Sequence, residues 1–386
     1  MPTISARLNR GPTALARASR SPKLHLRQTA LADVVGGWQH GALHEPEYTN
    51  MQHAFTSRLA LATLLAISFL LSESRAELDE QALERRQAQI ETILAISHSA
   101  IANPAFLNTP AWREFEHWLR GEEPLNLDDA EFRAAFNRAT RTLPFTHYRL
   151  FWRQQQGSGA DEGQRIVLES PAPDVALLRV PSFETDPADT AAVMARVIAG
   201  GYRDLIIDLR GNEGGSFPSV VALARALDGN AADAGVFLTR KWFVEHGDYP
   251  DAAGRAEIPT LQSLDLAAFA AQLESDGAVR LVLPPHDHPV FEGRVVLLTD
   301  HDTGSASEPF VYMLQTRGVP VIGQPTAGGM LSADRIPVDD TFVLFTPVAD
   351  YMTADGVRLD RLGVRPDIDV PAEMALQAAL EFLAGT

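Results

Sequence analysis

Short apolar runs alternate with helical stretches through the second half of the chain, and this alternation restricts the possible folds more than any other feature. The apolar runs, each a predicted strand, are Val175–Val180, Leu205–Leu209, Val295–Thr299, Val319–Ile322 and Phe342–Phe345. The helical stretches between them include Ala188–Ala199, Ser219–Leu227 and Ser307–Gln315. Strands that alternate with helices form βαβ units, and continuous apolar strands are typical of sheets covered on both faces. The sequence therefore predicts an α/β core built on a mostly parallel sheet.

The segment before this core has a helical pattern instead. Apolar residues recur there at spacings near 3.6, as in Ile90, Ile93, Leu94, Trp112, Phe115, Trp118 and Leu119. We expect a helical N-terminal domain over residues 77–150 and the α/β core over residues 160–386. Within the core, Asp228–Pro289 is richer in Gly, Asp and Pro. We expect this segment to be a long excursion with one helix near Leu264–Leu273.

An uncharged run of 13 residues, Leu59–Leu71, lies near the N-terminus. A membrane-spanning helix needs roughly 20 apolar residues, whereas a run of this length matches the centre of a secretory signal peptide. We therefore expect translation to begin at Met51, with a signal peptide over residues 51–76 that is cleaved after Ala76, and a periplasmic or secreted protein. Residues 1–50 would then be an over-extended, disordered N-terminus. The alternative interpretation of the run is a buried core helix.

The charge and the lack of cysteine exclude several classes of function. The formal net charge is −17, from 33 basic and 50 acidic residues. We expect no nucleic-acid partner, because such a surface repels phosphate backbones, and no stable membrane insertion. The absence of cysteine excludes disulfides, thiolate metal sites and a cysteine nucleophile. Among the basic residues, only Lys23 and Lys241 are lysines.

A glycine-rich loop carries the first candidates for chemistry. In Leu205–Gly215, LIIDLRGNEGG, a strand leads into a loop where Gly214 and Gly215 can turn sharply and present bare N–H groups. Such groups are the donors of an oxyanion hole. A phosphate-binding loop is the competing interpretation, but the pattern GxxxxGK(S/T) is absent from the sequence.

A serine-containing turn carries the next candidates. In Val295–Glu308, VVLLTDHDTGSASE, a strand ends in a turn and Ser305 precedes a helix. A serine at such a turn exposes its hydroxyl, and the amide of Ala306 lies beside any oxyanion that develops there. Ser305 and Glu308 also fit a capping box, so simple N-capping of the helix is the alternative.

Two further motifs follow, GQPTAGG at Gly323–Gly329 and GVRPDI at Gly363–Ile368. With DLRGNEGG at Asp208–Gly215 and GSASE at Gly304–Glu308, their order resembles the C-terminal-processing (tail-specific) family of serine peptidases. The resemblance is closest to the branch that contains the tricorn protease core and interphotoreceptor retinoid-binding protein, and it covers roughly half of the chain. It implies a crotonase-like (ClpP/crotonase) αβ spiral for the core, preceded by the small helical domain. It also implies that Ser305 is the nucleophile.

The resemblance implies partners for this serine. The processing peptidases use a lysine in the motif after the next strand, a position that falls at Gly329 here, so histidine is the natural substitute as general base. The tricorn-like branch has a Ser-His pair between its helical segment and its core sheet. Thr146 and His147 stand at that place, with Thr146 where the family has Ser. The acid of that branch corresponds to Asp360, where the family commonly has Glu.

Three other histidines are alternatives. His301 lies four residues before Ser305 and is the second candidate for the base. His286 and His288, in the polar loop PPHDHP, are a candidate metal pair. The leading interpretation implies no metal and no organic cofactor.

The sequence thus predicts an exported serine peptidase that cleaves peptides or unfolded protein segments through an acyl-enzyme on Ser305. Many members of the resembled family carry a PDZ domain before the core sheet. Only about 25 residues separate His147 from Val175, which is too few for that fold, so we do not expect the usual device for gripping a substrate C-terminus. Two alternatives remain: a catalytically inactive ligand-binding protein on the same fold, and an acyl-CoA enzyme of the wider crotonase-like group.

Overall fold

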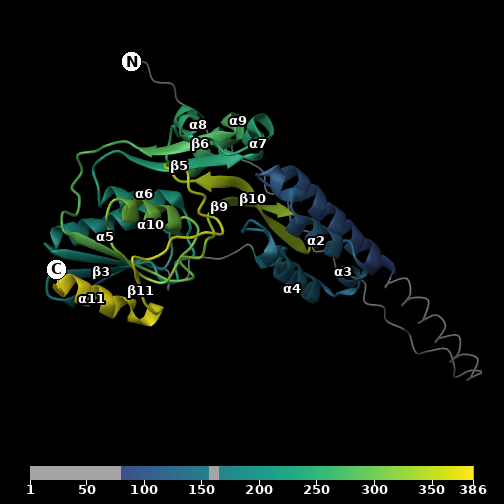
Figure 1. The fold of residues 1–386 in the computed structure, drawn as a ribbon. Helices are drawn as coiled ribbons and strands as arrows, with labels where there is room; N and C mark the ends of the chain where they lie inside the picture. Colours follow the sequence, from purple (N-terminus) through teal and green to yellow (C-terminus); the bar gives the residue numbers. More distant parts are fainter. Residues whose placement is uncertain (1–79, 156–164, 386) are drawn as a thin grey trace, which may run out of the picture. The chain divides into compact units, whose positions relative to one another are not determined.

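The computed structural model describes residues 80–155 and 165–385, which lie in one compact unit spanning Ser74–Thr386. The predicted over-extended N-terminus and the signal peptide fall outside the described residues. Within the described part of the chain, no helix is both long enough and apolar enough to cross a membrane. The predicted fold class is confirmed: the described residues form a mixed α/β core with a helical N-terminal region (Figure 1).

The larger sheet has six strands in the order β11-β8-β7-β4-β3-β2. These are β2 (Val167–Ala172), β3 (Val175–Arg179), β4 (Asp204–Asp208), β7 (Arg294–Thr299), β8 (Val321–Gly323) and β11 (Ile368–Asp369). All neighbouring strands are parallel except β2 and β3. The predicted mostly parallel sheet is therefore confirmed, and β3, β4, β7 and β8 coincide with predicted strands to within two residues at each end.

Both faces of this sheet are buried, which explains the continuous apolar runs. The covering helices are α5 (Pro187–Ala199), α6 (Phe217–Arg225), α10 (Ser307–Thr316) and α11 (Ala375–Gly385). Ala176 and Leu178 of β3 belong to the core that includes residues of α5, α6 and α10, whereas Val175 and Leu177 pack with α11. Figure 1 shows α11 on the opposite side of the sheet from α6 and α10.

A second sheet contains five antiparallel strands. These are β1 (Arg149–Trp152), β5 (Ala232–Thr239), β6 (Ala278–Leu283), β9 (Leu331–Pro337) and β10 (Phe342–Met352). The order is β1-β10-β5-β6, and β9 also pairs with β10. The pairing of β1 with β10 fixes the chain just after His147, because Arg149 lies opposite Phe345.

The expectation of a long excursion with a single helix over Asp228–Pro289 is wrong. This segment supplies β5 and β6 and three helices, α7 (Arg240–His246), α8 (Ala252–Glu257) and α9 (Leu266–Asp276), of which α9 matches the predicted helix. The apolar pattern of β5 is interrupted at Asp233, where its register with β6 shifts. Likewise β10 continues beyond the predicted end at Phe345. The prediction stops there because Pro347 interrupts the apolar run, at a register shift with β9.

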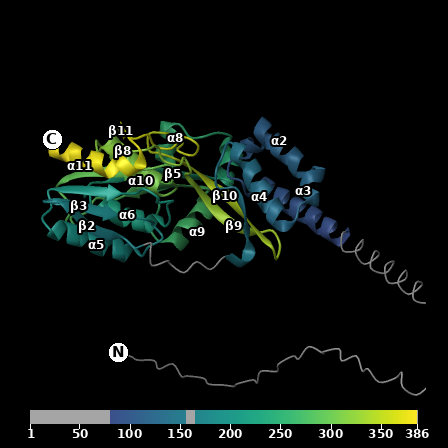
Figure 2. The same ribbon diagram turned by 90° about the horizontal axis from the view of Figure 1, so that it is seen from below.

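The helical region contains a helix over residues 80–100 and short helices that lead to β1. The short ones are η1 (Pro104–Asn108), α2 (Pro110–Leu119), α3 (Glu122–Asn126), α4 (Asp129–Ala139) and η2 (Thr140–Thr142). Their aromatic core also includes Leu331 of β9 and Phe342 and Leu344 of β10, and Figure 2 shows β9 and β10 beside α4. The helical region and strands β9 and β10 thus share one core. The division into two domains stays a prediction.

Candidate active site

Ser305 lies at the turn between β7 and α10, as the sequence predicts. Its φ is +52°, in the left-handed region that residues other than glycine rarely adopt. Two hydrogen bonds tie the turn to the loop after β4: Gly304 N donates to Asn212 O at 2.9 Å, and Thr303 Oγ1 donates to Leu209 O at 2.8 Å. The loop that follows β4 therefore holds the backbone next to the serine.

The alternative in which Ser305 and Glu308 form a capping box is wrong. The N-terminus of α10 has no side-chain cap. The Glu308 carboxylate instead accepts hydrogen bonds from the hydroxyl of Thr326 at 2.6 Å and from the amides of Gly328 at 2.7 Å and Gly329 at 2.8 Å. Burial raises the pKa of Glu308 to about 7, although the three hydrogen bonds oppose this shift.

Gly214 packs directly on the serine, and only a glycine fits there. A Cβ on Gly214 would lie 2.6 Å from Cβ of Ser305, and its φ is +104°. The Gly214 N–H is already donated to Asn212 Oδ1 at 2.8 Å. Among the described residues, no acceptor is found for the N–H of Gly215 or of Ala306. Of the two glycines predicted as oxyanion donors, Gly215 is therefore the one with an available amide.

Thr146, His147 and Asp360 form a hydrogen-bonded chain, although 214 residues separate the first from the last. The Thr146 hydroxyl donates to Asp360 Oδ1, and the Thr146 amide donates to Asp360 Oδ2 at 3.2 Å. The same hydroxyl oxygen lies 2.9 Å from Nδ1 of His147. Because the hydroxyl proton points to the carboxylate, the oxygen accepts from Nδ1–H, which leaves the lone pair of the imidazole on Nε2.

The pKa values of His147 and Asp360 suit a histidine that acts as a base at neutral pH. Burial, reinforced by the charge of Arg149, lowers the pKa of His147 to about 4, so the ring is neutral. Burial raises the pKa of Asp360 to about 6, while Arg358 and the Thr146 hydroxyl hold it below a still higher value. At pH 7 the carboxylate is therefore mostly ionised and can accept the threonine proton.

One segment contacts both halves of the site. Ala327 N donates to Thr303 O at 2.8 Å, next to the serine turn. Two residues later, a Cβ on Gly329 would lie 3.7 Å from Cε1 of His147. The structure therefore brings the serine turn and the histidine to the same segment. No hydrogen bond joins Ser305 to His147 within the described structure, as is common before substrate binds.

Backbone strain gathers at this site. Outside glycine, the described residues have positive φ at His147, Asp174, Ser305 and Arg361. Three of the four are the two proposed reacting residues and the neighbour of Asp360. Such conformations cost of order 1–3 kcal/mol each and cluster where function requires an exact orientation. Strain is therefore an independent pointer to the same residues.

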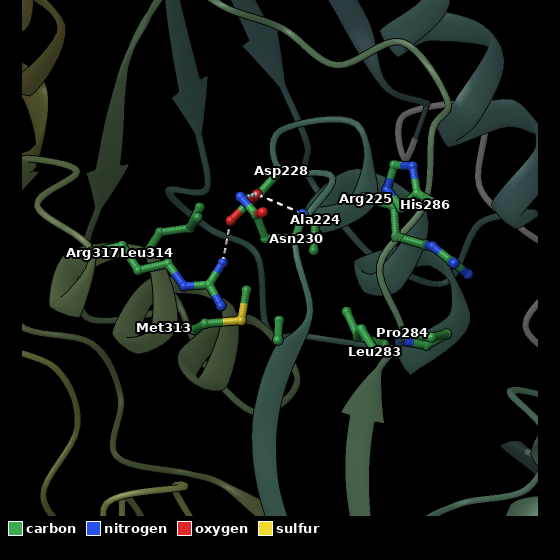
Figure 3. A pocket seen from close by; sticks show the side chains of 11 residues that line it. Ala224, Arg225, Asp228, Asn230, Leu283, Pro284, His286, Met313, Leu314 and Arg317 are labelled. Carbon is green, nitrogen blue, oxygen red and sulfur yellow. Dashed lines mark hydrogen bonds and ion pairs between the residues drawn. The ribbon is translucent and has the colours of Figure 1, made fainter.

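The alternative histidines lie elsewhere. His301 is exposed on its turn. His286 lines a small separate pocket with Arg225, Asp228 and Arg317, to which none of the residues of the proposed site contributes (Figure 3). Among the described residues, no group of three or more His, Cys, Asp or Glu is arranged to hold a metal ion, so His286 and His288 lack further ligands of these types.

An apolar pocket opens beside Ala306, between the second sheet and helices α6 and α10. It contains no charged side chain. Its lining consists of Phe217, Val220, Val221, Ala224, Ala234, Phe237, Leu281, Leu283, Ala306, Pro309, Phe310, Met313, Met330 and Tyr351. Ala306 and Met330 are the neighbours of Ser305 and Gly329, so the pocket adjoins the reacting groups.

Two residues of the site are missed by the sequence analysis, Glu308 and Arg358. Glu308 belongs to the GSASE motif, but the sequence pattern indicates only a helix cap at this position. Arg358 bridges Asp350 and Asp360. The one feature of the sequence that could have indicated Arg358 is its position two residues before the predicted acid, Asp360.

Comparison with known proteins identifies the family. The model of peptidase family S41 matches residues 174–370. A C-terminal processing peptidase, chloroplastic, from Tetradesmus obliquus is 28% identical over 176 residues, which is 45% of this chain and 30% of that protein. A crystal structure from Parabacteroides merdae, described as a candidate peptidase, superposes with a TM-score of 0.54 at 15% identity over 77% of this chain and 96% of its own, so it shares the fold. A lipoprotein from Streptococcus agalactiae gives 0.49 at 16% identity over 78% and 96%. With half of its length matched by the family model, the chain belongs to peptidase family S41, a family of serine-type hydrolases.

Proposed function

We propose that the protein is an exported serine peptidase that hydrolyses peptides or unfolded protein segments through an acyl-enzyme on Ser305, with His147 as general base. The observation that carries this proposal is the chain from Asp360 through Thr146 to His147, which leaves Nε2 of a neutral imidazole free to take a proton. A serine hydroxyl is a weak nucleophile without such a base.

In the proposed reaction, Ser305 Oγ attacks the carbonyl carbon of the substrate while its proton passes to His147 Nε2. The amides of Ala306 and Gly215 stabilise the oxyanion, and each such donor contributes about 3–4 kcal/mol. The C–N bond then breaks, and the imidazolium returns the proton to the leaving amine. Water, deprotonated by the same imidazole, hydrolyses the ester and restores the serine. Asp360 stabilises the imidazolium through Thr146 but stays ionised.

The position of Lys241 favours Ser-His over Ser-Lys chemistry. Its ammonium group donates to Ser275 O at 2.7 Å, at the contact between α7 and the end of α9. A lysine base needs its amine beside the nucleophile, and the amine of Lys241 is instead bonded to a carbonyl at this contact.

The apolar pocket points to the substrate. Because the pocket adjoins Ala306, an apolar side chain on the residue whose carbonyl is attacked would fill it. The Tetradesmus relative is named for C-terminal processing, so peptides with a free C-terminus and varied apolar residues are the first library to test. Export through the signal segment predicts a mature N-terminus after Ala76, which N-terminal sequencing of exported protein checks.

A serine-reactive fluorophosphonate probe tests the nucleophile. We expect wild type to be labelled, Ser305→Ala to remain unlabelled and Ser307→Ala to be labelled. Ser307 is a suitable control because it lies two residues away and is buried against Asn212. Equal labelling of wild type and Ser305→Ala would overturn the assignment.

The apolar lining of the pocket favours one second candidate, a catalytically inactive binding protein for an apolar ligand. Small-molecule sites are lined predominantly by apolar and aromatic side chains, as this pocket is. This candidate predicts an apolar molecule that co-purifies with the protein, no labelling by the probe and no cleavage of any peptide.

A further inference from the structure

Arg358 lies between two buried carboxylates. Its Nε donates to both oxygens of Asp350, at 3.1 and 2.9 Å, and its Nη2 donates to Asp360 Oδ2 at 2.9 Å. The side chains of Asp350 and Asp360 are 1% and 0% exposed. A guanidinium is suited to this place because its planar fork presents several donors in fixed directions, whereas lysine presents a point charge.

The same guanidinium also reaches the segment that carries the histidine. Nη1 donates to Pro144 O at 3.3 Å, three residues before His147. The group stacks over the ring of Phe106 in the helical region, with 4.9 Å between Cζ and the ring centroid. On the far side, the hydroxyl of Tyr249 donates to Asp350 Oδ2 at 2.7 Å. Arg358 thus joins the acid of the relay to the backbone leading to the base.

Several features oppose the charge of Asp360, and its ion pair with Arg358 counters them. Burial disfavours the ionised form, and the negative charge of Asp350 adds to that effect. Favouring ionisation are Arg358, Arg361 at longer range, and the hydroxyl and amide of Thr146. The guanidinium of Arg361 donates a hydrogen bond to Phe145 O at 2.8 Å. The direct ion pair with Arg358 is therefore decisive.

We infer that Arg358 is a positioning residue: it keeps Asp360 ionised and aimed at Thr146, and so holds His147 in the tautomer that accepts the serine proton. This inference rests on the proposed function. If Asp360 is protonated, its proton can be donated to the Thr146 oxygen, whose own hydrogen then points at Nδ1. The imidazole proton would be driven to Nε2, and the base would be lost.

The test is the rate of fluorophosphonate labelling of the full chain as a function of pH. In wild type, labelling should fall on the acid side as Asp360 is protonated. We expect Arg358→Met to move the midpoint of this fall upward by about one pH unit or more, with the rate recovering at higher pH. Arg358→Lys, which keeps the charge, should move it less. Arg365→Met, an exposed arginine of the same segment, should leave it unchanged.

Asp350→Asn supplies an independent arm, because it removes a negative charge that raises the pKa of Asp360. It should move the midpoint downward, opposite to Arg358→Met, and it serves equally if the methionine variant does not fold. A uniform loss of rate at all pH values, with no movement of the midpoint in any variant, would overturn the inference and leave a structural role. Failure of wild type itself to label would overturn the proposed function as well.

Discussion

Gly329 faces the imidazole of His147: a Cβ on that glycine would lie 3.7 Å from Cε1 of the ring and 3.8 Å from Oγ1 of Thr146. The position at which the processing peptidases carry a lysine is thus the backbone neighbour of the histidine. The proposed base, His147, therefore lies beside the position from which a lysine would project. This proximity makes a glycine at 329 compatible with a histidine at 147.

The glycines at 329 and 214 should respond differently to the same substitution. Gly329→Ala adds a methyl at an ordinary contact distance, so we expect activity within about threefold of wild type. Gly214→Ala places Cβ 2.6 Å from Cβ of Ser305 at a φ of +104°, so we expect a loss of at least 100-fold. Measured kcat/KM for a cleaved peptide decides this, with Tm as the control for folding. Similar losses in both variants would contradict the arrangement.

The hydroxyl at position 146 should matter more than the side chain that carries it. Thr146→Ser keeps the hydrogen bonds to Asp360 and His147 and should retain activity within about threefold. Thr146→Val keeps the shape but removes the hydroxyl, and we expect kcat to fall by about 10–100-fold or more. A valine variant as active as the serine variant would exclude threonine from the relay.

Activity should decline below about pH 6. The proposed relay requires an ionised Asp360, and burial raises the pKa of that carboxyl to about 6. His147, with its pKa lowered to about 4, stays neutral through that range and adds a second loss only in stronger acid. The profile of kcat/KM against pH reports these values for the free enzyme. A single fall near pH 4 would mean that Asp360 takes no part.

Glu308 should make the fold less stable as pH rises. Its pKa is about 7 in the folded state against 4.5 as its ordinary value, so the folded protein binds more protons between the two. The stability this gives is fully present below about pH 4.5 and is lost as pH rises through about 7. We expect Tm to decrease from pH 5 to 8 by less in Glu308→Gln than in wild type. Parallel curves for the two proteins would contradict the raised pKa.

The apolar pocket should set the preference for the substrate side chain. Ala234→Leu narrows the pocket from the side of β5, away from the reacting groups. We expect kcat/KM for a peptide with Phe before the cleaved bond to fall about tenfold relative to one with Ala, because a large side chain loses its space. Labelling by the fluorophosphonate probe is the control and should not change. An unchanged Phe to Ala ratio would place the side chain elsewhere.

Sequence patterns predict the strands that are buried on both faces and miss those that are not. β4 is apolar throughout its middle because helices cover both of its sides, whereas β5 contains Asp233 and β6 contains Arg280, which pair with each other across the strands. Half-exposed antiparallel strands carry such polar residues and lose their apolar signature. Of the second sheet, the sequence predicts only the start of β10, Phe342–Phe345, and the other four strands could be recognised only from their pairing.

The candidate site divides in the same way. Ser305 and Gly214 are recognisable because strand ends, glycines and a helix start are local features of the chain. The roles of Glu308 and Arg358 come from partners far along the sequence, such as Gly328 and Pro144. No spacing rule predicts these contacts, since they form only when the folded segments meet.

The strand that begins two residues after His147 has a further consequence. β1 has four residues, and its ladder with β10 anchors the chain that presents the imidazole. Short edge strands open locally more often than whole domains unfold. Each opening would withdraw the base while leaving the serine in place, so the fraction of competent molecules at any moment is bounded by the closed fraction of this ladder. Amide hydrogen exchange at Arg153, whose N–H donates to Thr341 O at 2.9 Å at the end of this ladder, would measure that bound directly.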